Sequence, residues 1–301
     1  MQFSGIYTPV ITPFLNDQNI DYDAFAKQVN YLVEAGVQGL VIGGTTGEYY
    51  VESPQERVEL LKIAKQITNE HCSVTFGTGS IDPNVSIELA GEGAKHGADA
   101  LLIATPPYVL PTQQELAQHV LRIDHIADLP VMLYNYPDRM GVNMQAEFFD
   151  AIANAKNFQA IKESSGDINR LHMLMNDYPH IQTSCGMDDQ ALEFFAWGAQ
   201  SWVCAGSNFL PAEHIALYQT CVIENNFAKG RKIMAAMMPL MSVLEQGGKF
   251  IQSVKYGVNL SGREAGEMRL PLSGLNTDEQ SAMAEVVNTL KTNVATIMAA
   301  A

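Results

Sequence analysis

Apolar residues in this chain follow two alternating patterns. Short, nearly continuous apolar runs are typical of strands buried on both faces of a parallel sheet, and they predict strands at 6–12, 39–44, 73–77, 100–105, 130–135, 158–163, 181–185 and 201–206. Between these runs, apolar residues recur every three or four positions, as on one face of a helix. That spacing predicts helices at 21–35, 53–69, 83–96, 112–127, 144–154, 167–177, 188–197 and 211–225.

A similar phrase of ten residues occurs at 35–44, 96–105 and 197–206. In each copy a glycine is followed by a short turn and then by a run that is almost entirely apolar. Glycine is common just after the last residue of a helix, because it adopts the left-handed backbone conformation at no steric cost. The phrase therefore predicts a helix that leads directly into a buried strand, which indicates a parallel sheet covered by helices.

Eight strand–helix units in about 225 residues predict a (β/α)8 TIM barrel of the α/β class. A doubly wound open sheet is the alternative, but no predicted strand is followed by the Gly-x-Gly-x-x-Gly turn of its dinucleotide-binding form. The remaining residues predict further helices with a polar break at 262–275. We therefore expect a catalytic barrel at 1–225 and a C-terminal helical extension at 226–301 that packs on it.

The charge of the chain narrows the range of partners. Its 301 residues include 33 acidic and 18 basic ones, for a formal net charge of −15 at pH 7. We expect neither nucleic acid nor an anionic membrane surface as a partner, because binding to either depends on basic surface. No apolar run is long enough to span a bilayer, and the first residues do not resemble a secretion signal. Four widely spaced cysteines are typical of reduced thiols in the cytoplasm, where we expect this protein: Cys72, Cys185, Cys204 and Cys221.

Lys162 lies within the sixth predicted strand. Because side chains alternate along a strand, Lys162 and Ala160 face one side and Ile161 the other. In a closed barrel one side is the interior, where burial would lower the pKa of the amine and make it available as a nucleophile. The competing interpretation is a lysine at a strand end that reaches water, which is the usual situation of a lysine.

Other candidate side chains follow the predicted strands, where the active site of such a barrel lies. Thr45 and Thr46 belong to a glycine-rich turn after the second strand, which suits a carboxylate or phosphate but could equally be a plain connection. Tyr134, on the fifth strand, lies at a depth similar to that of Lys162, and a phenol beside an amine can exchange protons with it. Arg139 follows the fifth strand and could bind a carboxylate through two hydrogen bonds.

Metal-dependent and serine-nucleophile chemistry are not supported. A catalytic metal would need several His, Asp or Glu ligands at strand ends, whereas the histidines fall on predicted helices or on turns before strands, at 71, 96, 119, 125, 172, 180 and 214. Ser164 and Ser165 precede a glycine but do not form the Gly-x-Ser-x-Gly motif of serine hydrolases. We therefore predict neither a metal nor another cofactor.

Three segments in this order, 44–48 (GTTGE), 134–137 (YNYP) and 161–163 (IKE), resemble signatures of the dihydrodipicolinate synthase / N-acetylneuraminate lyase family, within the class I Schiff-base aldolase superfamily. The resemblance extends over essentially the whole chain. It implies that Lys162 forms a Schiff base with the 2-carbonyl of pyruvate or a related 2-oxo acid, and that Tyr134 is the general acid/base.

The resemblance also assigns the remaining candidate positions. Thr45, together with Tyr108 donated by a neighbouring subunit, would complete a proton relay with Tyr134. The substrate carboxylate would be bound by Thr45 and Thr46, Arg139 would bind the carboxylate of a second substrate, and Gly44 and Cys204 complete the expected substrate-binding set. Members of the family are commonly homotetramers, built as dimers of dimers.

Three departures from the synthase pattern leave the second substrate open. Pro107 replaces a tyrosine, Tyr49 and Tyr50 follow the glycine-rich turn in place of small apolar residues, and 250–255 replaces an Asn-Pro-x-Pro-Val-Lys segment. The leading hypothesis is a synthase-like condensation of pyruvate with aspartate semialdehyde. The alternative is a dehydratase or deaminase of a 2-keto-3-deoxy sugar acid or of a hydroxyproline-derived pyrroline carboxylate. A sialic acid-type aldolase and a non-catalytic metabolite-binding barrel rank below these.

Overall fold

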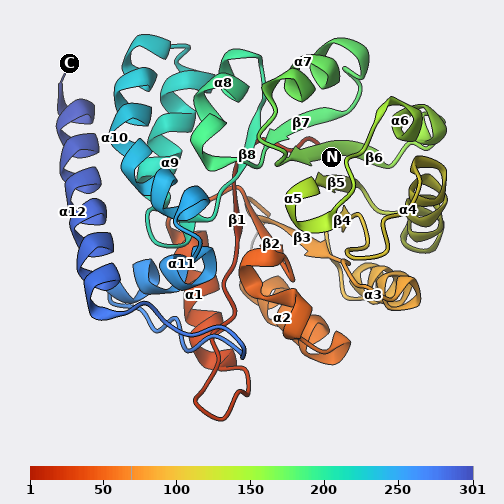
Figure 1. Cartoon of the computed structure of the whole chain (residues 1–301), viewed down its shortest axis with the longest axis horizontal. Helices are drawn as coiled ribbons and strands as arrows, with labels where there is room; N and C mark the ends of the chain where they lie inside the picture. Colours follow the sequence, from red (N-terminus) through yellow and green to blue (C-terminus); the bar gives the residue numbers. More distant parts are fainter. Residues whose placement is uncertain (69, 301) are drawn as a thin grey trace.

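Eight parallel strands close into a barrel in the order in which they occur in the chain, as predicted (Figure 1). The computed structural model describes residues 1–68 and 70–300. The strands are β1 Gly5–Pro9, β2 Gly39–Ile42, β3 Ser73–Gly77, β4 Ala100–Ala104, β5 Val131–Asn135, β6 Phe158–Glu163, β7 Gln182–Cys185 and β8 Ser201–Val203. The barrel closes where β1 pairs with both β2 and β8, so the open-sheet alternative is wrong.

Helices connect successive strands and surround the barrel (Figure 1). They are α1 Tyr22–Glu34, α2 Pro54–Ile67, α3 Pro83–Lys95, α4 Gln113–Ala127, α5 Pro137–Met140, α6 Ala146–Ile152, α7 Ile168–Asp177, α8 Ala191–Ala196 and α9 Pro211–Tyr218. Two predicted helices have irregular ends, because Asp188–Gln190 forms a 3-10 turn before α8 and Gln219–Ile223 forms a π-helical turn after α9. The short helix α5 was not expected from the sequence.

Local sequence explains where several helices begin. The Ser53 hydroxyl accepts a hydrogen bond from the Glu56 backbone N–H, and the Glu56 carboxylate accepts one from the Ser53 N–H at 2.7 Å. This reciprocal capping box satisfies N–H groups that the first turn of α2 would leave unpaired. Pro54 occupies the first helical position, where its missing N–H costs nothing.

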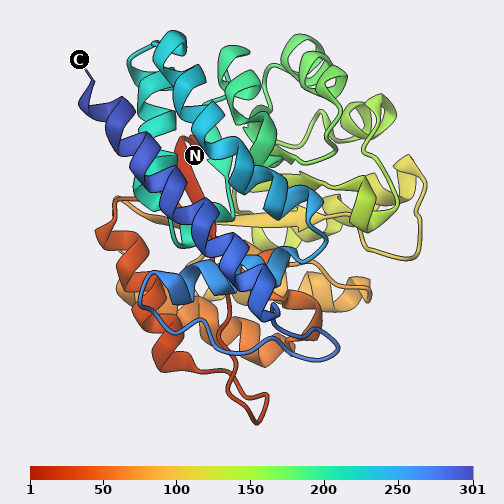
Figure 2. The ribbon, with the colours of Figure 1, turned by 60° about the vertical axis from the view of Figure 1, so that its left-hand side comes forward.

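Three further helices follow the barrel: α10 Phe227–Gln246, α11 Phe250–Leu260 and α12 Thr277–Ala299. The predicted polar break falls in the non-helical segment between α11 and α12. Figure 2 shows α12 lying along α10 on the outside of the molecule. Because α10 also contacts the turn Asp188–Gln190 after β7, its C-terminal end lies at the C-terminal mouth of the barrel.

Alternation along the strands produces two separate apolar clusters. Inward-facing side chains fill the barrel interior, among them Tyr7, Leu102, Met132, Ala160 and Val203. Their outward-facing neighbours pack against the surrounding helices, among them Leu101, Leu133 and Ile161. The expected division of β6 into inward and outward faces is therefore confirmed, and the interior cluster forms the floor beneath the mouth.

None of the helices in the described residues is long and apolar enough to cross a membrane. The four cysteines are unpaired, and each is buried. Burial raises the pKa of the Cys72 thiol to about 12, so that this thiol stays protonated at neutral pH.

Candidate active site

Lys162 lies inside the C-terminal mouth of the barrel, with 9% of its surface exposed. Its register partner on the neighbouring strand is Tyr134, and the Lys162 Nζ lies 4.4 Å from the centre of the Tyr134 ring. Parallel pairing of β5 with β6 therefore brings the two predicted catalytic side chains into contact. The interpretation of Lys162 as a strand-end lysine that reaches water does not hold.

The surroundings of this pair favour the uncharged form of both groups. Burial lowers the pKa of Lys162, while the nearby carboxylates of Asp188 and Glu245 oppose that change. Burial raises the pKa of the Tyr134 phenol, and the Thr45 hydroxyl and the Arg139 charge offset part of the rise. A neutral amine is a nucleophile and a protonated phenol is an acid, so the pair combines the two functions that imine formation needs.

The glycine-rich turn carries its two threonines to the same mouth. Residues Thr45–Gly47 form a single 3-10 turn directly after Gly44, and both threonine side chains are buried. The Thr45 Oγ1 makes no hydrogen bond of normal geometry in the part of the chain that the structure describes. Because a buried polar atom without a partner is costly, this hydroxyl is available to a ligand that enters the mouth.

A buried ion pair holds the end of this turn. Glu48 has a left-handed backbone, φ 63°, and its Oε1 lies 2.6 Å from the Nζ of Lys255 on α11. The Glu48 Oε2 accepts a hydrogen bond from the backbone N–H of Arg269 at 3.2 Å. The C-terminal helices thus fix the threonine turn, which shows that they contribute to the site as well as covering the barrel.

These elements enclose one cavity, which we call the barrel pocket. It is lined by Pro9, Val41, Gly44, Thr45, Thr46, Leu102, Tyr134, Tyr136, Arg139, Lys162, Gly186, Asp188, Val203, Ala205, Glu245 and Phe250. Lys162 and Tyr134 lie among its lining residues together with the two threonines, Gly44 and Arg139. The structure therefore brings together six of the eight predicted site residues.

The other two predicted residues lie elsewhere. Tyr108, in the loop after β4, is 87% exposed and does not line the barrel pocket. Cys204, just after β8, is fully buried and belongs to the apolar cluster outside the barrel. Cys204 therefore faces away from the cavity, because the residue before it, Val203, faces in.

Asp188 is a member of the pocket that the sequence analysis missed. Its Oδ1 accepts a hydrogen bond from the Trp202 indole at 2.9 Å, and its Oδ2 accepts one from the Ala205 N–H at 3.2 Å. Burial raises the pKa of Asp188 to about 8, and the negative charge of Glu245 adds to that rise. The rule that functional residues follow the strands could have found Asp188, because it comes three residues after β7 ends at Cys185.

Gly186 provides the space that Lys162 occupies. A Cβ at position 186 would lie 2.7 Å from the Lys162 Cγ and 2.9 Å from the backbone oxygen of Glu163. The second contact is with backbone, which cannot rotate away. Any larger residue at position 186 would therefore displace β6 and the reactive amine.

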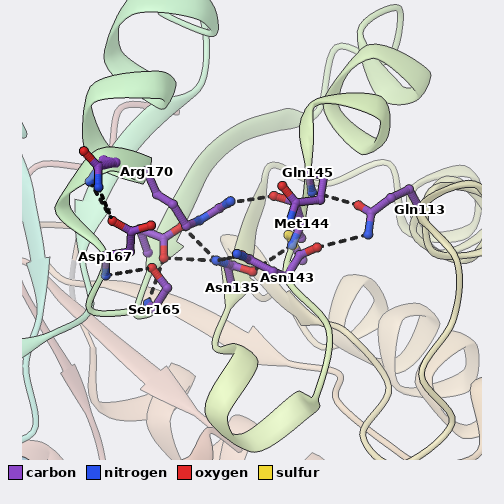
Figure 3. Close-up of polar contacts among 10 residues, drawn as sticks. Gln113, Asn135, Asn143, Met144, Gln145, Ser165, Asp167 and Arg170 are labelled. Carbon is purple, nitrogen blue, oxygen red and sulfur yellow. Dashed lines mark hydrogen bonds and ion pairs between the residues drawn. The ribbon is translucent and has the colours of Figure 1, made fainter.

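On the outer face of β5 and β6, a polar network holds the two strand ends together (Figure 3). The Glu163 carboxylate accepts hydrogen bonds from the Asn135 Nδ2 at 2.9 and 3.0 Å and from the Arg170 Nε at 3.0 Å. Asn135 also donates to Asn143, while Arg170 and Asn135 both bond to the backbone of Met144. Since Asn135 and Glu163 directly follow Tyr134 and Lys162, this network sets the depth and direction of the inner pair.

Metal ligation finds no support in this site. Among residues 1–68 and 70–300, no group of three or more His, Cys, Asp or Glu side chains is arranged to hold an ion. The barrel pocket is lined by a buried amine, two phenols, two threonine hydroxyls, an exposed guanidinium and two carboxyls. These groups can bind the carboxylate of a small anionic ligand, and the amine can attack the carbonyl carbon of that ligand.

Comparisons with known proteins agree on one family. A sequence model of the dihydrodipicolinate synthetase family matches residues 2–290. The 4-hydroxy-tetrahydrodipicolinate synthase of Fervidobacterium nodosum is 35% identical over 278 residues, which cover 90% of this chain and 92% of that protein. The enzyme of the same name from Methanocaldococcus jannaschii is 32% identical, with 96% and 99% covered. The solved structure of the 4-hydroxy-tetrahydrodipicolinate synthase from Methylacidiphilum fumariolicum SolV superposes with a TM-score of 0.90 at 29% identity, covering 99% of each chain.

Proposed function

The chain belongs to the dihydrodipicolinate synthetase family, and from this premise we propose that it condenses pyruvate with aspartate semialdehyde through a Schiff base on Lys162. The observation that carries the proposal is the contact between the buried Lys162 amine and the Tyr134 ring within the barrel pocket. As a member of this family the protein is a lyase of the Schiff-base type.

The first half of the reaction follows from the state of the inner pair. The neutral amine of Lys162 attacks C2 of pyruvate, and Tyr134 supplies the proton with which the carbonyl oxygen leaves as water. Thr45 and Thr46, with Gly44 beside them, bind the pyruvate carboxylate at the 3-10 turn. The resulting iminium withdraws electrons from C3, so that C3 loses a proton and becomes the carbon nucleophile.

The second half of the reaction uses the outer part of the pocket. The enamine carbon attacks the aldehyde carbon of the second substrate, whose carboxylate pairs with Arg139. The Arg139 guanidinium lies over the Tyr136 and Phe250 rings at 5.4 and 6.0 Å, which leaves its N–H groups available for a carboxylate. We assign the buried Cys204 a supporting place behind the substrate-binding wall, since its side chain does not reach the pocket.

The assembly and location of the protein are part of the same proposal. Tyr108 is almost fully exposed, so that it is free to enter the site of a neighbouring subunit and complete the relay with Thr45 and Tyr134. We therefore propose a homotetramer that is a dimer of dimers, working in the cytoplasm on small 2-oxo acids.

One observation supports the second candidate, a dehydratase or deaminase acting on a single longer 2-oxo or pyrroline acid. Tyr50, from the segment that departs from the synthase pattern, lines a recess beside Arg139 and thereby changes the wall that the second substrate would meet. The two candidates share Lys162 and Tyr134. They differ in whether pyruvate and an aldehyde are consumed together or one substrate alone releases water or ammonia.

Borohydride reduction in the presence of pyruvate, followed by peptide mass mapping, tests the shared chemistry. We expect the adduct on Lys162, and we expect Lys162→Ala to lose the adduct and at least ~1000-fold in activity. Lys156→Ala is the matched control, because the Lys156 side chain is 82% exposed. A fully active Lys162→Ala variant with no adduct at Lys162 in the wild type would overturn the proposal. Consumption of aspartate semialdehyde only when pyruvate is present then separates the synthase from the single-substrate enzymes.

A further inference from the structure

Glu245 is a carboxylate at the mouth of the barrel that none of the steps above uses. It lies one residue before the end of α10 and lines the barrel pocket together with Arg139 and Lys162. It also lines the adjoining entrance recess, formed by Tyr50, Tyr136, Arg139, Leu244, Glu245, Gly248, Phe250, Ile251, Gln252 and Leu272. Glu245 and Arg139 are the charged residues of that recess. Whatever enters the pocket past these residues therefore meets one group of each sign.

The two charged groups do not neutralise each other. In the part of the chain that the structure describes, Glu245 forms no ion pair within 4.0 Å, with Arg139 or with any other cation. The Glu245 Oε1 accepts a hydrogen bond of 3.3 Å from the Asp188 backbone N–H, which orients the carboxylate. Its Oε2 has no partner among the described residues and is free to bind a ligand.

Asp188, the other acidic residue of the pocket, cannot take this role. Both of its oxygens already accept hydrogen bonds, from Trp202 and from the backbone of Ala205. Burial also raises the pKa of Asp188 to about 8, so that at neutral pH it is mostly protonated and carries no charge to attract an ammonium group. Glu245 is therefore the carboxylate of the pocket that can accept a hydrogen bond from a substrate cation.

We propose that Glu245 binds the α-ammonium group of the second substrate while Arg139 binds its α-carboxylate, and that Glu245 then removes the ammonium proton so that the amine can displace Lys162. This inference rests on the proposed function and names the class of its second substrate, an aldehyde that carries an α-amino acid group. Within residues 1–68 and 70–300 neither Glu245 nor Arg139 forms an ion pair, and the two groups complement the two charges that such a substrate bears on one carbon.

The displacement balances without any further reactant. After the carbon–carbon bond has formed, C2 of the pyruvate unit is still an iminium on Lys162. The substrate ammonium gives one proton to Glu245, and its lone pair forms a bond to C2. The attacking nitrogen, now a cation, loses its second proton to water and so regains a lone pair. Glu245 returns the first proton to the Lys162 nitrogen, the lone pair of the attacking nitrogen forms a double bond to C2, and the C2–Nζ bond breaks, with its electron pair leaving on the lysine as a neutral amine. The product is a neutral cyclic imine once the third proton of the attacking nitrogen has been lost to water.

The charges of the site agree with this order of proton-transfer steps. Burial raises the pKa of Glu245 and so makes it a stronger base than an exposed carboxylate, while the cations Lys162 and Arg139 oppose that rise and Asp189 adds to it. Lys162 in turn is affected by the Glu245 charge. The charges of Glu245 and Lys162 thus influence each other's pKa in the free protein.

The test compares Glu245→Gln with wild type on two aldehydes, aspartate semialdehyde and its analogue without the amino group, 4-oxobutanoate. We expect kcat/KM for aspartate semialdehyde to fall by ~10- to 100-fold, the range for losing a hydrogen bond to a charged group. We expect the inhibition constant of 4-oxobutanoate to stay within about twofold, because that analogue has no ammonium for Glu245 to bind. Trapping of pyruvate on Lys162 should be unchanged, which also shows that the variant is folded. Glu285→Gln, on the exposed face of α12, is the matched control.

The outcomes separate this inference from the function on which it rests. If the wild type consumes aspartate semialdehyde with pyruvate and Glu245→Gln does so equally well, the role of Glu245 is wrong and the synthase activity stands. If Glu245→Gln weakens the binding of both aldehydes equally, the proposed role of Glu245 is also wrong. Such a result would indicate a change of pocket shape rather than loss of an ammonium contact. Failure of the wild type to consume aspartate semialdehyde would overturn the synthase activity and this inference with it.

Discussion

The inner and outer faces of the β5–β6 strand ends differ by a single residue position and have opposite chemistry. On the outer face, Asn135 and Glu163 belong to a network in which the carboxylate is bonded to Arg170 and to the Asn135 amide. On the inner face, Tyr134 and Lys162 contact each other ring to amine, and the amine has no carboxylate within 4.0 Å among the described residues.

The comparison teaches where this protein gains stability and where it keeps reactivity. A buried ion pair that is fully hydrogen-bonded fixes geometry, because removing either partner leaves a charge without compensation. A buried amine without such a partner costs stability, and its pKa is lowered, so that it is reactive. The hydrogen-bonded network on the outer face therefore holds the reactive pair on the inner face in place.

The largest effect should come from breaking the outer face. Arg170→Leu leaves the Glu163 carboxylate buried without its cation, which costs about 3–5 kcal/mol in the free energy of unfolding. Urea unfolding measures this cost. Lys95→Leu is the matched control: its ion pair with Glu92 is exposed, so its loss should cost less than about 1 kcal/mol. Equal costs for the two variants would show that the network does not hold the strand ends.

On the inner face, removing the phenol oxygen should affect catalysis and leave stability almost unchanged. Tyr134→Phe keeps the ring that contacts Lys162 and removes the proton donor, so kcat should fall by ~100- to 1000-fold. The free energy of unfolding should change by no more than about 1 kcal/mol, the net contribution of one hydrogen bond. Steady-state kinetics and urea unfolding measure the two quantities. Tyr178→Phe, which removes a hydroxyl bonded to Asp150 outside the barrel, should keep full activity. A large loss of stability in Tyr134→Phe would contradict the division between the faces.

Much of this architecture could be predicted because it depends on local pattern. Apolar runs located all eight strands. Alternation along β6 predicted a common face for Ala160 and Lys162, and in the structure the inner face of the barrel carries Lys162. Parallel register then determined that Tyr134 would lie beside it. These predictions depend on the two-residue period of a strand and on the order of strands and helices, and both can be read from the amino-acid sequence.

The rest of the site depends on contacts between distant segments. Glu245 lies on a helix after the barrel, and Lys255 on α11 pairs with Glu48, about two hundred residues earlier in the chain. No periodicity links such positions, because they meet only when the C-terminal helices pack over the mouth. Cys204, which the resemblance placed in the substrate-binding set, belongs to the cluster outside the barrel, because the strand alternation that places Val203 inside turns Cys204 outward.

The smallest predicted effect is a gain of stability from a change on the inner face, opposite in sign to the loss predicted for Arg170→Leu. Lys162→Met replaces the amine by an apolar chain of similar length. At pH 8.5 the free energy of unfolding of the variant should therefore exceed that of the wild type by about 1 kcal/mol. Because burial lowers the pKa of Lys162, the unfolded wild type binds a proton there that the folded state does not, up to the ordinary lysine value near 10.4. The stability of the wild type should therefore rise with pH relative to the variant, and the difference should disappear as pH approaches about 10.4. Urea unfolding of both proteins between pH 8.5 and about 10.4 measures this difference. A gain that persists unchanged to that pH would mean that Lys162 is charged in the folded protein, and the inner face would then resemble the outer one.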